Sequence, residues 1–258
     1  MRTPLGRPST RRPDRSRPRP SPSPQKPRGP WKAGAVPVIG LVGGIGAGKS
    51  RVAAMMAEKG AHVLDADAIG HVLLDQPPTR DEVIEKFTEQ VIDTSQSGGP
   101  PVIDRKKLGA IVFADVTSRK VLEAILHPRM RQTFEKAISR TARKKLESAV
   151  ILDAAVLFEA RWNELCDVVV FVDAPLEVRQ ARVQASRGWT PETHADREAA
   201  QMSLDQKRSK CDFVLANTGD EATLTAAVAA LWEKLTRRPK VDPSVHRFRR
   251  PTRPDPAV

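Results

Sequence analysis

The chain has 258 residues, of which 40% are hydrophobic, which is enough for one domain of ordinary size or two small ones with a buried core. Its formal net charge of +12 lies at the ends: residues 1–35 carry +9, residues 237–258 carry +5, and residues 36–236 carry −2. The composition therefore excludes a uniformly basic nucleic-acid-binding domain.

Both basic ends are rich in proline and poor in apolar side chains, as in "RRPDRSRPRPSPSPQKPRGP". Such segments bury too little apolar surface to fold, so we expect disordered tails at residues 1–35 and 237–258. The first tail lacks the apolar core of a secretory signal, and no stretch approaches the roughly 18 apolar residues of a membrane helix, which predicts a soluble, cytoplasmic protein without a membrane partner. The leader has the Arg and Ser content of an organelle transit peptide, but its prolines oppose the amphipathic helix of such peptides. It could also lie upstream of the true start, or bind RNA or anionic surfaces weakly.

From Pro37 onward, β-like apolar runs alternate with segments of helical periodicity. The predicted strands are residues 37–43, 61–67, 149–155, 167–174 and 212–217. Joined by helices, they predict an α/β fold within residues 36–236: an open, five-stranded parallel sheet with helices on both faces. About 80 residues separate the second and third strands, so we expect a helical insertion at about residues 75–147. A shorter helical stretch at about residues 178–210 is suited to a lid.

The first strand leads directly into "GGIGAGKS", which fits G-x-x-x-x-G-K-[ST] without a mismatch. Between a strand and a helix this motif predicts a phosphate loop, because glycine dihedrals and the helix N-terminus let successive N–H groups face phosphate oxygens. Lys49 is expected to bridge the β- and γ-phosphates, and Ser50 to ligate Mg²⁺. The predicted ATP-binding residues are Gly44, Ile45, Gly46, Ala47, Gly48, Lys49, Ser50 and Arg51.

Asp153 lies near the end of the third predicted strand, where a carboxylate could cap a helix or bind Mg²⁺ through water; beside a phosphate loop we favour the metal. The sequence has neither the N-K-x-D motif of GTPases nor the "LSGGQ" motif of ABC-type ATPases. A small-molecule kinase fits best, because such an enzyme needs an acceptor-binding insertion and a lid that excludes water.

Asp65 and Asp67 stand two residues apart at the end of the second predicted strand, so their side chains share a face if the strand continues through both. One carboxylate could take or orient the proton of an acceptor hydroxyl while the other holds water on the metal. Asp65 could instead only cap the following helix.

Cysteine and histidine give no sign of a metal or redox site. Cys166 and Cys211 each precede a predicted strand without metal-ligand spacing, so we expect small buried thiols. The histidines at positions 62, 194 and 246 have no partners at ligand spacing, and we assign them no role.

Six segments occur in the order typical of one known family: "GLVGGIGAGKS", "VLDADAIGHVL", "IDRKKLGAIVF", "LEAILHPRMR", "ILDAAVLFE" and "QMSLDQKRSKCDFVLANTG". Together they resemble the dephospho-coenzyme A kinases, from about residue 38 to about residue 235. The resemblance implies a P-loop kinase fold with a helical CoA-binding insertion and a lid. It also implies transfer of the ATP γ-phosphate to the ribose 3′-hydroxyl of dephospho-CoA with Mg²⁺, the last step of coenzyme A synthesis, with no requirement for nucleic acid.

The same resemblance suggests roles for individual residues. Asp67 becomes the first choice for the acceptor-side carboxylate, with Asp65 beside it. Arg182 and Arg187 match lid arginines that could neutralise charge on the transferring phosphoryl group. Together with Lys49, these four form the expected catalytic set. The expected acceptor-binding residues are Asp67, His71, Arg105, His127 and Arg131, although the basic ones could equally be solvated surface groups.

Three positions depart from the family pattern: Arg51 replaces a small hydroxyl residue, Gly70 an alanine and Ala155 a proline. Glu159 matches the pattern, but its role does not follow from the sequence. Two alternatives stay open: a kinase of another small alcohol or nucleotide, and an RNA-binding protein with a degenerate core and active basic tails. The sequence leaves the oligomeric state undetermined.

Overall fold

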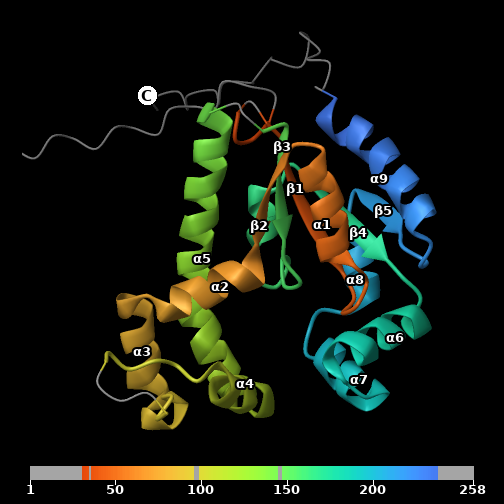
Figure 1. Ribbon diagram of the computed structural model, residues 1–258. Coiled ribbons are helices and arrows are strands. Elements are labelled where there is room, and N and C mark those ends of the chain that lie inside the picture. Colours follow the sequence, from red (N-terminus) through yellow and green to blue (C-terminus); the bar gives the residue numbers. More distant parts are fainter. Residues whose placement is uncertain (1–30, 35, 96–98, 145–146, 238–258) are drawn as a thin grey trace, which may run out of the picture.

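A five-stranded parallel sheet forms the centre of the protein, with its strands in the order β2-β3-β1-β4-β5 (Figure 1). The computed structural model describes residues 31–34, 36–95, 99–144 and 147–237. The predicted parallel sheet is thus confirmed, and each predicted strand is present. Their bounds are β1 Val38–Gly43, β2 Ala61–Asp65, β3 Ala149–Asp153, β4 Val168–Asp173 and β5 Phe213–Ala216.

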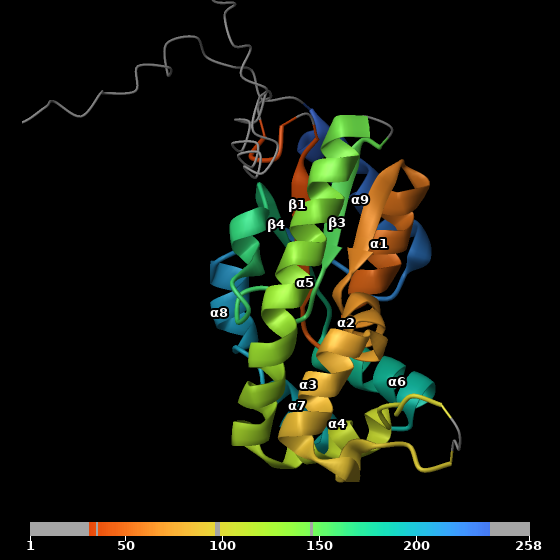
Figure 2. The same cartoon turned by 90° about the vertical axis from the view of Figure 1, so that its left-hand side faces the viewer.

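Helices cover both faces of the sheet, as right-handed crossovers between parallel strands require (Figure 2). On one face, α1 (Lys49–Glu58) and α9 (Glu221–Thr236) bury Met56 and Trp232 against the sheet. On the other, α5 (Val116–Lys144) packs near the short helix η2 (Trp162–Leu165), and Phe134 meets Trp162 edge to face at 5.0 Å. The sheet therefore separates two apolar layers.

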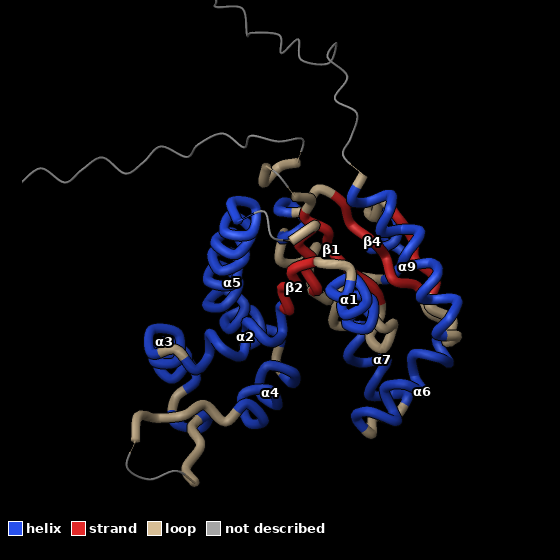
Figure 3. The backbone as a smooth tube through the Cα atoms, turned by 45° about the horizontal axis from the view of Figure 1, so that its top comes forward, coloured by secondary structure: helices blue, strands red, loops and turns tan. Residues whose placement is uncertain are grey.

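The insertion between β2 and β3 is helical and has a small apolar core of its own. It comprises α2 (Ala66–Asp75), α3 (Pro77–Phe87), the short helix η1 (Glu89–Val91), α4 (Arg105–Ala114) and α5. Helix α5 belongs to both parts of the fold, because Ile125 lies in the core of the insertion and Phe134 against the sheet. Figure 3 shows α5 beside α2. The insertion begins at residue 66, earlier than the predicted 75.

The segment between β4 and β5, called the lid below, folds as α6 (Leu176–Arg187), α7 (Pro191–Ala199) and α8 (Leu204–Ser209). Helices α6 and α7 lie beyond the carboxyl ends of the strands, and α4 lies beyond the same ends on the side of the insertion (Figure 1). The phosphate loop is therefore flanked by two helical parts.

The basic tails fall almost entirely outside the described residues, so their predicted disorder stays a prediction. Residues 31–34 differ, because they form a turn against the sheet: the Lys32 N–H donates to Asp167 Oδ1 at 2.7 Å, and the Gly34 N–H donates to the Trp31 carbonyl at 3.0 Å. The tail expected to run through residue 35 thus gives way to ordered contacts from residue 31. None of the described helices is long and apolar enough to cross a membrane.

Candidate active site

The phosphate loop runs from the end of β1 to the start of α1, and its backbone requires glycine. Gly46 and Gly48 have φ of +81° and +90°, in the left-handed region that favours glycine. A Cβ on Gly48 would also lie 2.3 Å from the amide nitrogen of Asn217. Gly48 is the N-cap of α1, so the helix N-terminus and its free N–H groups point toward the loop. The structure thus has the backbone that the motif predicted.

Two side chains support the loop from the β5 side. Asn217, buried just after β5, donates from Nδ2 to the Ala47 carbonyl at 2.8 Å and accepts from Arg182 at Oδ1 at 3.0 Å. Arg182 also faces the carbonyls of Gly46 and Ala47, both at 3.4 Å. Arg182, expected to neutralise the transferring phosphoryl group, is therefore engaged with the loop backbone. Sequence reasoning missed Asn217, although its position at the carboxyl end of a strand was a usable signal.

The lid holds the loop at its tip. Glu198 on α7 accepts from the Ile45 N–H at 3.3 Å, and it is paired with the buried guanidinium of Arg179. His194, also on α7, is 1% exposed, and its Nε2 lies 3.1 Å from the Ile45 carbonyl, to which it must donate. From the sequence, His194 was assigned no role because it has no partner at metal-ligand spacing, and its contact with Ile45 joins residues 149 positions apart. Ile45 is thus held by α7 through both its N–H and its carbonyl.

Lys49, Ser50 and Asp153 meet where α1 starts and β3 ends. The Ser50 hydroxyl donates to Asp153 Oδ2 at 2.8 Å. Burial raises the pKa of Asp153, and the positive charge of Lys49 and the Ser50 hydrogen bond oppose that rise. Burial likewise lowers the pKa of Lys49, against the opposing effect of Asp153. The structure therefore brings the predicted lysine and both predicted metal ligands together.

Asp65 and Asp67 are close, but not for the predicted reason. Strand β2 ends at Asp65, and α2 begins at Ala66, so the strand does not continue through both aspartates. Asp65 is the N-cap of α2, and its Oδ1 accepts from the Ala68 N–H at 3.0 Å. Asp67 lies in the first turn of the helix, where a carboxylate is stabilised by the helix dipole. Both still line the same cavity.

Two neighbouring cavities open at this edge of the sheet. The first, called the loop cavity, has a volume of about 460 Å³ and is bordered by Lys49, Ser50, Asp65, Asp67, Asp153 and Arg187. The second, the insertion cavity, has about 400 Å³ and lies among α2, α4 and α5. Asp67 lines both, whereas Asp65 lines only the first. Asp67 is therefore the aspartate at the junction of the two spaces.

The insertion cavity contains most of the basic residues expected to bind an acceptor. His71, Arg105 and His127 line it, and Arg105 is paired with Asp75 at 2.6 Å. Burial lowers the pKa of His127, whose ring meets Trp162 edge to face at 5.1 Å. The cavity also includes Arg119 and Glu123 of α5, which line the loop cavity too and which sequence reasoning did not select.

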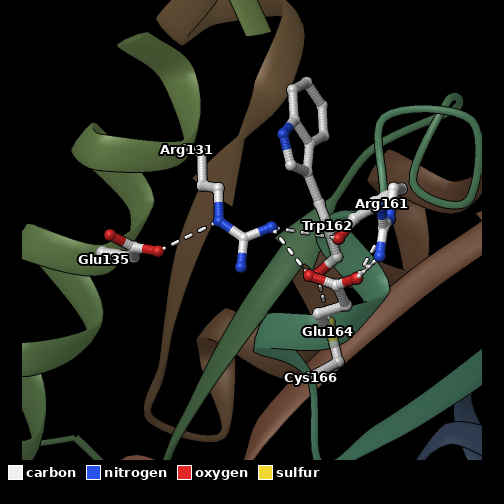
Figure 4. Close-up of polar contacts among 6 residues, drawn as sticks. All are labelled: Arg131, Glu135, Arg161, Trp162, Glu164 and Cys166. Atoms are coloured by element: carbon white, nitrogen blue, oxygen red, sulfur yellow. Dashed lines mark hydrogen bonds and ion pairs between the residues drawn. The ribbon is translucent and has the colours of Figure 1, made fainter. Parts of the chain in front are cut away.

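Arg131 lies apart from this group, in a surface network (Figure 4). Its guanidinium pairs with Glu135 on the same helix at 3.1 Å and with Glu164 at 3.1 Å, and it donates to the Arg161 carbonyl at 3.3 Å. These contacts link α5 to the loop around η2. The structure does not bring Arg131 to the insertion cavity with the other predicted acceptor-binding residues.

Glu159 takes part in a buried anchor of the lid. Lys207 on α8 is 0% exposed, and its Nζ lies 3.0 Å from Glu159 Oε1. The same Nζ donates to the Ala155 carbonyl at 2.7 Å and to Gln201 Oε1 at 2.9 Å. Glu159 also accepts from the Met202 N–H at 2.8 Å. The anchor ties the end of the lid to the loop that follows Asp153.

Arg51, predicted among the ATP-binding residues, is on the exposed side of α1. It forms an ion pair with Glu221 in the first turn of α9. Arg187, in contrast, lines the loop cavity together with Lys49. Of the predicted arginines, the structure thus brings Arg187 to the loop cavity and directs Arg51 toward another helix.

Comparison with known proteins gives one consistent result. Residues 37–223 match the dephospho-CoA kinase family. The chain is 39% identical to a dephospho-CoA kinase of Thermobifida fusca over 78% of its own length and 96% of the relative. It is 40% identical to a dephospho-CoA kinase of Symbiobacterium thermophilum over 76% of its own length and 80% of the relative. Among solved structures, TT1252 of Thermus thermophilus is 34% identical with a TM-score of 0.65, and the alignment covers 78% of this chain and 98% of that one.

Proposed function

The chain belongs to the dephospho-CoA kinase family, and from this membership we propose how its own residues perform the reaction. The enzyme transfers the γ-phosphate of ATP to the ribose 3′-hydroxyl of dephospho-CoA, which completes coenzyme A. Such a transfer needs little covalent chemistry from the protein, and it depends on positioning and on stabilisation of charge. The two cavities supply separate places for the two substrates.

ATP binds with its phosphates in the phosphate loop, where Gly46, Gly48 and the start of α1 present N–H groups. Lys49 contacts the phosphate oxygens, and Arg187, which lines the same cavity, compensates the charge that develops during transfer. Arg182 contributes indirectly, because it holds the loop through its carbonyls.

Dephospho-CoA occupies the insertion cavity, with its ribose toward the junction. The observation that supports this arrangement is that Asp67 lines both cavities, so its carboxylate can reach an acceptor hydroxyl that faces the phosphate. We assign Asp67 the role of orienting this hydroxyl and accepting its proton. Basic groups for the phosphates of the acceptor come from Arg105, Arg119 and His71.

Mg²⁺ fits Ser50 and Asp153. Both offer hard oxygen atoms, which lie 2.8 Å apart in the loop cavity. Among the described residues, no group of three or more His, Cys, Asp or Glu side chains forms a metal site. Two protein oxygens suit an ion that keeps several waters and also binds substrate phosphates. When bound, the ion would neutralise charge on these phosphates. A cytoplasmic location is part of the same proposal.

The test is to incubate the purified protein with Mg·ATP and dephospho-CoA and to measure CoA by chromatography. We expect CoA from the unmodified protein and none from Lys49→Ala. Asp67→Asn should lower kcat by about 100-fold or more, because general base catalysis typically contributes about 10²–10⁴-fold. Asp65→Asn is the matched control, since asparagine is also a good N-cap and should keep α2 in place.

Two results would overturn these assignments. Equal losses of kcat in Asp65→Asn and Asp67→Asn would remove the distinction drawn from the cavities. Absence of CoA from an unmodified protein that binds ATP would mean that the acceptor is wrong, and small alcohols and nucleotides would then be screened.

A further inference from the structure

An arginine of the lid is sandwiched between aromatic rings from two different parts of the fold. The guanidinium carbon of Arg197 on α7 lies 4.2 Å from the ring centre of Trp189, between α6 and α7. It lies 4.5 Å from the ring centre of Phe113, near the end of α4 in the insertion. A cation at these distances from a ring face is attracted to it. One planar cation thus links the lid to the insertion.

The surroundings of Arg197 indicate that the rings hold it in place. Its Nε is buried and has no hydrogen-bond partner. Phe113 is 43% exposed, so its ring face is accessible to the guanidinium of Arg197. Trp189 is in addition 4.9 Å from the guanidinium carbon of Arg187. The contact is therefore a stack of side chains from α4, α6 and α7.

This stack borders the space where transfer takes place. Phe113, Trp189 and Arg197 line the loop cavity together with Lys49 and Asp67. Helices α4 and α7 both lie beyond the carboxyl ends of the strands, with α4 on the side of the insertion (Figure 1). Closing such a space expels water and protects a reactive phosphoryl group from hydrolysis.

We propose that Arg197 and Phe113 are positioning residues that join the lid to the insertion, and that this contact keeps water from competing with the acceptor for the phosphoryl group. The inference rests on the proposed kinase function. Neither side chain needs to touch the reacting atoms. Their contribution is to keep the loop cavity closed while both substrates are present.

The experiment measures ADP and CoA in the same reaction with Mg·ATP and dephospho-CoA. The unmodified protein should release about one ADP for each CoA, because water is excluded. Phe113→Leu keeps an apolar side chain but has no ring, and Arg197→Lys keeps the charge but has no planar group. Phe113→Leu should raise the rate of ATP hydrolysis relative to transfer by about two-fold to about five-fold, the factor expected for one lost cation–π contact. Arg197→Lys should raise it by less, because an ammonium still binds one ring face but cannot stack between two rings.

Three further variants make the test specific. Phe113→Tyr retains a ring, so its ratio of ADP to CoA should equal that of the unmodified protein. Val116→Ala, at an exposed apolar position at the start of α5, is the matched control and should leave the ratio of ADP to CoA unchanged. The double variant Phe113→Leu with Arg197→Lys should raise the rate of hydrolysis relative to transfer no more than the single variant with the larger effect, because the two residues act through one contact.

The inference fails if Phe113→Leu and Arg197→Lys keep the ratio of the unmodified protein while CoA is still formed. It also fails if the two effects multiply in the double variant, or if Phe113→Tyr behaves like Phe113→Leu. If the unmodified protein forms no CoA at all, the proposed function is wrong and the inference falls with it. Melting temperatures of all variants show whether a changed ratio comes from local closure or from unfolding.

Discussion

Asn217→Asp should weaken ATP binding by disturbing the backbone of the phosphate loop. The side chain has two partners of opposite kinds: the Ala47 carbonyl accepts from Nδ2, and Arg182 donates to Oδ1. These partners allow only one orientation of the amide. Aspartate has the same shape but no N–H, so it would place an oxygen where the amide nitrogen lies 2.8 Å from the Ala47 carbonyl.

The size of the effect follows from the lost hydrogen bond. A buried acceptor left without its donor costs about 1–3 kcal/mol. If this cost falls on the loop conformation that binds phosphate, the KM for ATP rises between about 5-fold and about 140-fold, since about 1.4 kcal/mol corresponds to ten-fold in affinity. The ion pair gained with Arg182 moderates this loss but does not remove it, because the Ala47 carbonyl still lacks its donor.

The assay is steady-state kinetics with ATP varied at saturating dephospho-CoA, together with a direct titration of ATP. The KM for dephospho-CoA should change little, because Asn217 does not line the insertion cavity. Asn163→Asp, which makes the same chemical change in η2, is the control. An ATP KM within two-fold of the unmodified value would refute the idea that Asn217 holds the loop.

Three further predictions concern stability and the thiols. Gly70→Ala should stabilise the protein by about 1 kcal/mol, and raise Tm by about 2–4 °C, because alanine favours the interior of α2 and its Cβ would meet only the Met130 side chain at 3.6 Å. Lys207→Met should lower the free energy of unfolding by about 3–5 kcal/mol in a denaturant titration, because it leaves the partners of a buried ammonium unpaired. Lys210→Met, at an exposed position, should lower it little. Burial raises the pKa of buried Cys166 and of half-buried Cys211 to about 12 from an ordinary 9.0, so both thiols should react with Ellman's reagent at pH 8 far more slowly in the native protein than in the unfolded one.

The raised thiol pKa values also set a pH dependence. Between pH 9.0 and about 12 the native state keeps these protons while the unfolded state loses them, so their contribution to stability is lost as the pH rises through this range. The structure buries Cys166 as expected but leaves Cys211 half-buried. Fast labelling of Cys166 in the native protein would contradict its burial. A Tm unchanged or lowered by Gly70→Ala would mean that the alanine Cβ does not fit beside Met130. Equal losses of unfolding free energy in Lys207→Met and Lys210→Met would mean that the buried anchor is not stabilising.

The sheet, the phosphate loop and its lysine were predictable because each depends on a local pattern. Alternating apolar runs gave the strands, and the spacing of glycine, lysine and serine gave the loop. Asp153 was predictable from its position at a strand end. The exact end of β2 was not, because "DAD" is compatible with both a strand and a helix start, and the N-cap bond of Asp65 decides between them.

Roles that depend on the rotation of a helix or on distant contacts were not predictable. Arg182 and Arg187 are five residues apart on α6, which is about 140° of rotation beyond a full turn, so one faces the loop carbonyls and the other the loop cavity. The partners of Ile45 lie about 150 residues away on α7, at Glu198 and His194. Only the packing of α7 on the loop brings these side chains to it.

The length of α5 has a mechanical consequence. This single helix of 29 residues packs against the insertion through Ile125 and against the sheet through Phe134. It therefore fixes the helices around the insertion cavity relative to the sheet. Pro128 lies between these two contacts and lacks the N–H that would donate to the preceding turn, so α5 would bend most easily there.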